Sequence, residues 1–245
     1  MNKLFLQSLT LEPPGEFYLK EGLEANRKIC QKQQTELRHR LLSEGKHQSA
    51  VQLFFKQHAM LHSASMAQSE HFSLEDEVFE NLSEDKARLI PRTSENSIVW
   101  NIWHIARIED VTMNMLVAGR EQVFTEGEWQ TVLGIENRDT GNAMPAELII
   151  RLSQNIVIPA LRAYRVAVGR RTGEIVMQLP PANLKDKVDP ARLVKVQSSG
   201  AVIPAASGLI EYWRKRTIAG LLLMPATRHN LIHLNECLRL KEKKS

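Results

Sequence analysis

Two histidines four residues apart, His229 and His233, are the residues of this 245-residue chain whose types and spacing most clearly suggest chemistry. Residues i and i+4 of a helix project from one face about one turn apart, so two imidazoles can bind a single metal ion. The HxxxH pattern is short and often occurs by chance. A metal site therefore needs a third ligand from elsewhere in the chain.

His104 is the best candidate for that ligand. At helical spacing it shares a strongly apolar face with Trp100 and Val111, which points it toward the interior of a bundle. Glu109 and Asp110 lie five and six positions further on and are turned away from this face by the 3.6-residue period. We expect these two acids at the surface or in contacts around the site, not as ligands. The alternative is a core histidine bonded to a backbone carbonyl.

Three histidine ligands would leave one coordination position open, as in catalytic rather than structural metal sites. An ion such as Zn²⁺ would acidify water there or bind a substrate thiol as the thiolate. Asn230 follows His229 where an HExxH metalloprotease has its glutamate base, which disfavours that chemistry. Asn230 is instead a candidate for a contact around the site. Glu236 could act through water as a general base, or could be a solvent-facing residue near a helix end. Cys237 on the same stripe is more often a buried small side chain than a ligand.

A second HxxxH pair, His58 and His62, lies in an earlier amphipathic segment. If that helix packs beside the other histidines, either residue could approach the metal as an extra ligand or hold a bound water, and His62 is one of the candidates for contacts around the site. The alternative is a polar edge of the helix.

Apolar spacing predicts four long helices that position these residues. The first runs from Gln48 through His62, the second from an N-cap at Thr93 or Ser94 to Gly119, the third from Pro145 to Gly169, and the fourth from near Ser207 through the final HxxxH. Pro159 should kink or split the third helix, and Pro225 should bend the fourth or open a new one.

The predicted class is all-α, an up-down four-helix bundle over residues 47–241. Residues 1–46 are rich in charged and amide side chains and are predicted to form an N-terminal arm with a helix on the outside. Residues 173–207 are dense in turn signals and should hold short helices and loops, as a loop-rich insertion before the last helix.

Composition limits the remaining classes. The 32 basic and 28 acidic residues give a formal charge of +4 spread along the chain, which does not indicate nucleic-acid binding. Only Cys30 and Cys237 are present, which suits a reduced cytoplasmic protein. The apolar run at residues 1–6 is too short for a signal-peptide core, and no apolar stretch has membrane-spanning length. Phe124 and Trp129 are expected on the surface, where such apolar residues indicate a contact with a partner, such as a second copy.

The stretches Asn96-Ser-Ile-Val-Trp-Asn-Ile-Trp-His-Ile-Ala-Arg-Ile-Glu-Asp and Thr217-Ile-Ala-Gly-Leu-Leu-Leu-Met-Pro-Ala-Thr-Arg-His-Asn-Leu-Ile-His-Leu-Asn-Glu resemble the DinB/YfiT-like family of metalloenzymes. The resemblance covers residues 48–240 in helix order and implies a four-helix bundle in which His104, His229 and His233 bind a divalent metal. It implies zinc or nickel, or iron in some relatives, and often a homodimer. Characterised relatives include thiol-dependent S-transferases that use low-molecular-weight thiols.

Three classes of function follow. The first is a metal-dependent transferase or hydrolase-like enzyme whose open position activates a thiol or water on a small-molecule substrate. The second is a noncatalytic metal-binding protein with a stress-related or interaction role. The third is a helical scaffold in which the histidines are structural.

Overall fold

The computed structural model describes residues 23–67, 72–91 and 96–243. All regular secondary structure in these ranges is helical, and the only strand-like pairing within them is an isolated bridge between Lys187 and Thr217. The all-α prediction is therefore confirmed. Thr93 and Ser94, predicted as N-caps, lie outside the described residues.

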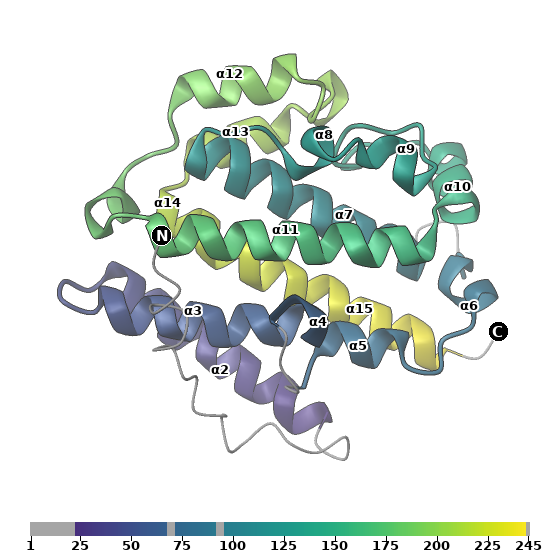
Figure 1. Cartoon of the computed structure of the whole chain (residues 1–245), viewed down its shortest axis with the longest axis horizontal. Helices are drawn as coiled ribbons and strands as arrows, with labels where there is room; N and C mark the ends of the chain where they lie inside the picture. The colour runs from purple at the N-terminus through teal and green to yellow at the C-terminus, as the bar shows by residue number, and fades with distance from the viewer. Residues whose placement is uncertain (1–22, 68–71, 92–95, 244–245) are drawn as a thin grey trace.

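Four helices surround the interior of the bundle: α3 (His47–Leu61), α7 (Ile98–Asp110), α11 (Ile158–Gln178) and α15 (His229–Glu242). Helix α7 packs against α11 and α15, and these same two helices also contact α3 (Figure 1). Helices α11 and α15 thus lie between α3 and α7. Long side chains from α3 and α7 can meet only near the centre of the bundle.

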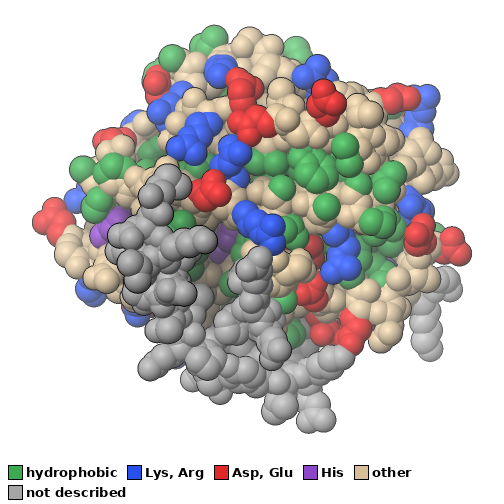
Figure 2. Space-filling view, viewed as in Figure 1, with side chains coloured by type: hydrophobic (Ala, Val, Ile, Leu, Met, Phe, Trp, Pro, Cys, Tyr) green, Lys and Arg blue, Asp and Glu red, His purple; other side chains and the backbone are tan. Residues whose placement is uncertain are grey.

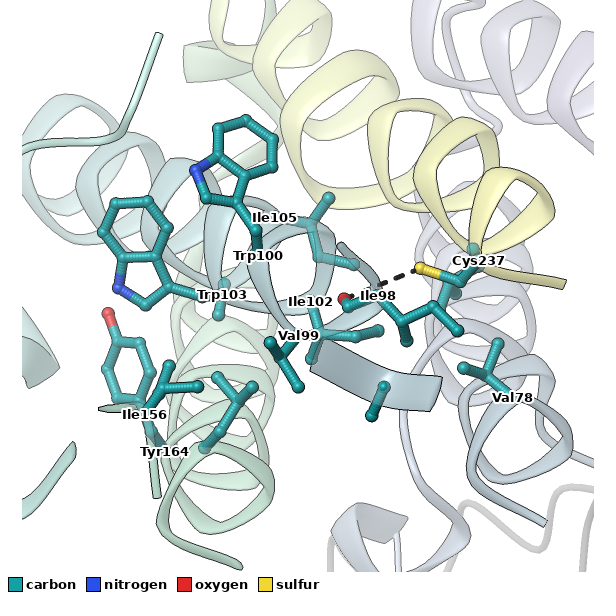
Figure 3. Close-up of a cluster of buried hydrophobic side chains, with 14 of the residues drawn as sticks. Val78, Ile98, Val99, Trp100, Ile102, Trp103, Ile105, Ile156, Tyr164 and Cys237 are labelled. Atoms are coloured by element: carbon teal, nitrogen blue, oxygen red, sulfur yellow. Dashed lines mark hydrogen bonds between the residues drawn. The ribbon is translucent and has the colours of Figure 1, made fainter. Parts of the chain in front are cut away.

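Helix α7 is buried on every side. It begins at Ser97, whose Oγ accepts a hydrogen bond from the backbone N–H of Trp100 at 3.1 Å, and all of its residues are buried. The chain continues in a wide π-helical segment, η2 (Val111–Ala118), and ends at Gly119 with φ 68°. The predicted helix end at Gly119 is confirmed. Glycine is favoured at this position because the backbone there is left-handed. Figure 3 shows apolar side chains of α7 directed to several of its sides.

The third predicted helix is split, as Pro159 indicated. Helix α10 (Ala146–Asn155) ends just before α11, in which Pro159 takes an early position where its missing N–H costs nothing. The predicted end at Gly169 is wrong, because α11 continues to Gln178. Gly169 lies within α11 because a Cβ at this position would be 2.8 Å from Nδ1 of His62.

The last part of the chain is less continuous than predicted. Helix α13 (Gly208–Arg214) ends, and Thr217 caps a new helix, α14 (Ile218–Leu223), by accepting from the N–H of Gly220. Pro225 then lies in the π-helical turn η5 (Met224–Arg228), which leads directly into α15. Pro225 therefore neither ends the helix nor starts a new one, and it is accommodated by a wider turn.

Helix α2 (Leu23–Leu42) packs on α3 and α14 and buries Cys30, Leu37 and Leu41. The remaining elements are α4 (Ala64–Ala67), α5 (Leu74–Phe79), α6 (Glu84–Arg88), α8 (Val123–Glu126), α9 (Trp129–Leu133), η3 (Pro181–Lys185), α12 (Pro190–Ser198) and η4 (Pro204–Ala206). The segment at 173–207 thus holds the end of α11 and several short helices, which were predicted there together with loops.

The surface gives little support to Phe124 as a contact for a second copy. Phe124 is 3% exposed and lies beneath the guanidinium of Arg107 at 3.9 Å, and the ring of Trp129 packs 5.3 Å from that of Tyr164. The expectation that Phe124 lies on the surface is therefore wrong. Figure 2 shows basic and acidic side chains interspersed over one face. None of the described helices combines the length and apolar character that a bilayer span requires.

The Ser97 cap allows a direct test of what holds α7. Replacing Ser97→Ala removes the bond to Trp100 and a second bond to Oγ of Ser153, so we expect a loss of about 1 to 2 kcal/mol in the free energy of unfolding. Urea denaturation measures this. The matched control is Ser83→Ala, which removes the cap of the short, partly exposed α6 and should cost distinctly less. Equal losses in both variants would contradict a special role for Ser97.

Candidate metal centre

The structure brings the three predicted histidines together. The ring centroids of His104 and His229 are 5.1 Å apart, those of His104 and His233 are 5.0 Å apart, and those of His229 and His233 are 4.5 Å apart. One ring nitrogen from each residue lies within 4.8 Å of one from each of the others. Two ligands from α15 and one from α7 therefore form one compact group.

Hydrogen bonds fix the tautomers of two of these rings. Nδ1 of His104 is 2.6 Å from the carbonyl oxygen of Thr140, and a carbonyl only accepts, so Nδ1 carries the proton. Asn101 donates from Nδ2 to the carbonyl of Ser97, which leaves its Oδ1 to accept from Nδ1 of His233 at 2.7 Å. In both rings Nε2 therefore keeps its lone pair. Such support of a ligand histidine through its other nitrogen is common in metal sites.

His229 differs from the other two. Its Nδ1 is buried and has no hydrogen-bond partner among the described residues. A buried ring nitrogen without a partner costs free energy unless a ligand satisfies it. The donor set of three imidazoles and this unsatisfied histidine fit a divalent metal ion.

Burial keeps the three imidazoles neutral. It lowers the pKa of His104 to about 3, of His229 to about 2 and of His233 to about 4. The neighbouring ring of His233 adds to the effect on the pKa of His104, while the charge of Glu236 opposes it at His233. Neutral imidazole is the form that binds metals. His104 is buried, whereas His229 and His233 are partly exposed, so the group is open on one side.

His58 and His62 do not join this group. Nε2 of His58 is 2.7 Å from Oε1 of Glu109, and Nε2 of His62 is 3.0 Å from Oε2. These three residues form a separate cluster of potential ligands and are 1% exposed or less. Of the two positions expected for Glu109, at the surface or in contacts around the site, the surface is wrong. Every residue of α7 is buried, and Glu109 contacts His58 and His62 of α3.

Asp110 is also buried, although it too was a candidate for the surface. Its carboxylate accepts hydrogen bonds from the backbone N–H groups of Val123 and Phe124, both at 2.8 Å, and from the hydroxyl of Tyr164 at 2.6 Å. Burial raises the pKa of Asp110, and the nearby charge of Arg107 opposes this shift. Asp110 therefore holds the segment after η2 in place and is not part of either histidine group.

Asn230 joins the second cluster to a buried ion pair. Its Nδ2 donates to Oε2 of Glu109 at 2.8 Å, and its Oδ1 accepts from Arg165 at 3.1 Å. Arg165 also pairs with Glu75 and donates to the carbonyl of Leu61. Burial would raise the pKa of Glu109, but the charges of His62 and His58 and their hydrogen bonds hold it well below its usual value. Glu109 is therefore a carboxylate.

The other two candidates on α15 are engaged elsewhere. Glu236 is partly exposed and pairs with Arg239. Cys237 is fully buried, and its thiol lies 3.9 Å from the carbonyl of Ile98 (Figure 3). Burial raises the pKa of this thiol well above its usual value. Cys237 therefore lies in the core, and Glu236 forms an ion pair at a partly exposed position.

A groove of about 750 Å³ lies elsewhere, between α2 and the segment from α13 to α15. Its lining includes Arg38, Arg216 and Arg228 but none of the clustered histidines. The groove is therefore not the opening of the histidine group.

The lowered pKa values predict how stability depends on pH in metal-free protein. Below about pH 6.5 the histidines of the unfolded chain become protonated, whereas the buried imidazoles of the folded chain stay neutral. The free energy of unfolding therefore falls as the pH drops from about 6.5 toward 3, the pKa of His104 in the folded chain. We expect a slope of up to about 1.4 kcal/mol per pH unit for each buried histidine. Urea unfolding at several pH values measures it. His104→Gln should flatten the slope, whereas the control His39→Gln, at an exposed position, should not.

Comparison with known proteins agrees with the helical arrangement. The family described as the DinB superfamily matches residues 71–237, which include the three-histidine group but not His58 and His62. A search of curated proteins gave no match. Because the family match spans well over half of the chain, this protein belongs to the DinB superfamily.

Proposed function

We propose that this chain is a metal-dependent enzyme in which His104, His229 and His233 hold a divalent ion, which is zinc or nickel, with iron as the alternative. The observation that carries the proposal is the commitment of Nδ1–H of His104 to Thr140 and of His233 to Asn101, which leaves both Nε2 atoms free. Hydrogen bonds of this kind orient ligands in advance. A histidine serving only as a core residue needs no such convergence with two others.

The chain supplies orientation and a neutral ligand set. Helix α7 and the backbone at Thr140 hold His104, and Trp100 stacks on its ring with centroids 4.8 Å apart. His229 and His233 remain partly exposed, which leaves one side for a small molecule. A bound divalent ion with no anionic ligand would act as a strong Lewis acid that lowers the pKa of a thiol or water at its open position.

The nucleophile in this proposal comes from outside the chain. Cys237 is buried with a raised thiol pKa, and Glu236 is paired with Arg239. Neither is placed to attack a substrate beside the histidines. A low-molecular-weight thiol or a water molecule fits this arrangement, so the reaction class is thiol-dependent transfer or hydrolysis. A homodimer and a cytoplasmic location remain predictions.

Metal content is the first test. We expect purified protein reloaded with Zn²⁺ or Ni²⁺ to lose the ion of this group in His104→Ala and His233→Ala, as measured by elemental analysis. Asn101→Ala frees Nδ1 of His233 and should weaken affinity about 10- to 100-fold. The matched control is His39→Ala at an exposed position. Unchanged metal content in folded variants of all three group positions would reject the site.

Thiol chemistry is the second test. Metal-loaded protein should catalyse adduct formation between an electrophile and glutathione, bacillithiol, mycothiol or coenzyme A, or hydrolyse a small ester, and His104→Ala should abolish the metal-dependent rate. In Co²⁺-substituted protein, a thiol that binds the ion should also change the visible absorption spectrum. Retained metal without metal-dependent turnover would favour a noncatalytic metal-binding protein with an interaction or stress-related role.

A further inference from the structure

The cluster of His58, His62 and Glu109 repeats the pattern of the first histidine group. Two histidines at i and i+4 come from one helix, α3, and the third side chain comes from α7. The donor atoms lie within 4.8 Å of one another. His58 and His62 also lie outside the residues that match the DinB superfamily, so the cluster is a feature that the match does not account for.

The charge of Glu109 is not balanced by a lysine or arginine. Within the described part of the chain, its carboxylate receives hydrogen bonds from the two imidazoles and from the amide of Asn230, all uncharged groups when the rings are neutral. Arg165 reaches Asn230 and is paired with Glu75. A fully buried carboxylate is costly without a positive partner. The positive charge that stabilises this carboxylate therefore comes either from a proton held by the two imidazoles or from a bound cation that replaces it.

The chemistry of the donors favours a transition metal ion. The two imidazole nitrogens contact different oxygens of one carboxylate, so an ion between them would have two nitrogen ligands and one carboxylate ligand. Metal–nitrogen and metal–oxygen distances near 2.0–2.2 Å need only a small widening of such a cluster. Two histidines and a carboxylate suit Zn²⁺, Mn²⁺, Fe²⁺, Co²⁺ or Ni²⁺.

The rings of His58 and His62 are held in place by their hydrogen bonds to Glu109. His62 lies against the backbone of α11 at Gly169, where a Cβ would be 2.8 Å from its Nδ1. That Nδ1 has no hydrogen-bond partner among the described residues. Because a carboxylate only accepts, Nε2 of His62 carries the ring proton in the metal-free cluster. A bound ion would replace this hydrogen bond, and the ring proton would move to Nδ1.

We propose that His58, His62 and Glu109 form a second divalent-metal site, sealed within the bundle and distinct from the three-histidine group. Because all three side chains are at most 1% exposed, the ion would serve as a structural cofactor that joins α3 to α7. The proposal does not depend on the function proposed for the other group.

Metal stoichiometry tests it. We expect full-length protein loaded with Zn²⁺ and freed of excess ion to hold about two equivalents per chain. His229→Ala should keep about one equivalent, and X-ray absorption at the zinc edge should show two imidazoles instead of three. Glu109→Gln should lose the sealed ion and keep the other. Release to a chelator from the wild type should be biphasic, with the sealed ion slower.

Control variants keep the outcomes distinguishable. Asp110→Asn changes a neighbouring buried carboxylate that belongs to neither group and should retain both ions when folded. If Glu109→Gln does not fold, the metal content of His62→Gln and the ion that remains in His229→Ala test the sealed site instead. The proposal is overturned if folded His229→Ala holds no ion, or if folded Glu109→Gln holds as many ions as the wild type. Wild-type protein that holds the sealed ion but none at His104, His229 and His233 would instead reject the function proposed above.

Discussion

Buried polar side chains at the centre of this bundle need hydrogen-bond partners, and neighbouring helices supply them for Glu109, Asn230 and His233. One turn of α15 meets this requirement in two directions at once. His229 and His233 face His104, whereas Asn230 between them faces Glu109 and Arg165. Asn230 can do this because its amide both donates and accepts, which a carboxylate at the same position could not. A glutamate there would place a second negative charge beside Glu109. The two centres are thus coupled through the rotation of a single helix.

That rotation is set by the wide turn immediately before α15. Pro225 has no N–H, and its ring would clash with the carbonyl four residues earlier in a regular α-helix. The π-helical turn η5 avoids the clash, and the carbonyls that it leaves free are satisfied by side chains. Thr227 donates to the carbonyls of Leu222 and Leu223, and Asn230 donates to those of Pro225 and Ala226. An extra residue in a turn rotates everything after it by about 100°. The proline therefore fixes the direction in which the histidines point.

Much of this could be predicted from the sequence, and the failures have physical causes. The i and i+4 spacing of His229 and His233 and the apolar stripe of His104 are local patterns that a helix preserves. The sequence therefore predicted that these three side chains lie close together, as they do in the structure. Glu109 was missed because helical periodicity was used as if one face of α7 met solvent. The run from Ile98 to Ile108 is apolar on all sides, which indicates a helix buried all round. The break before Thr217 could not be read locally, since its bridge to Lys187 is a long-range contact.

The two clusters differ in the charge of their donors and in their exposure, and these differences act together. A ligand set of three neutral imidazoles does not reduce the charge of a bound ion, which then remains available to polarise a thiol or water on the side where His229 and His233 are partly exposed. A carboxylate in the sealed cluster would offset part of the charge of an ion, which lowers the cost of burying it where no substrate can approach. Exchanging the two donor sets would weaken both effects, because a carboxylate would moderate the open site and three neutral rings would leave a buried ion uncompensated. The distribution of Glu109 and His104 along α7, five residues apart and on opposite sides of one buried helix, is what separates these two environments.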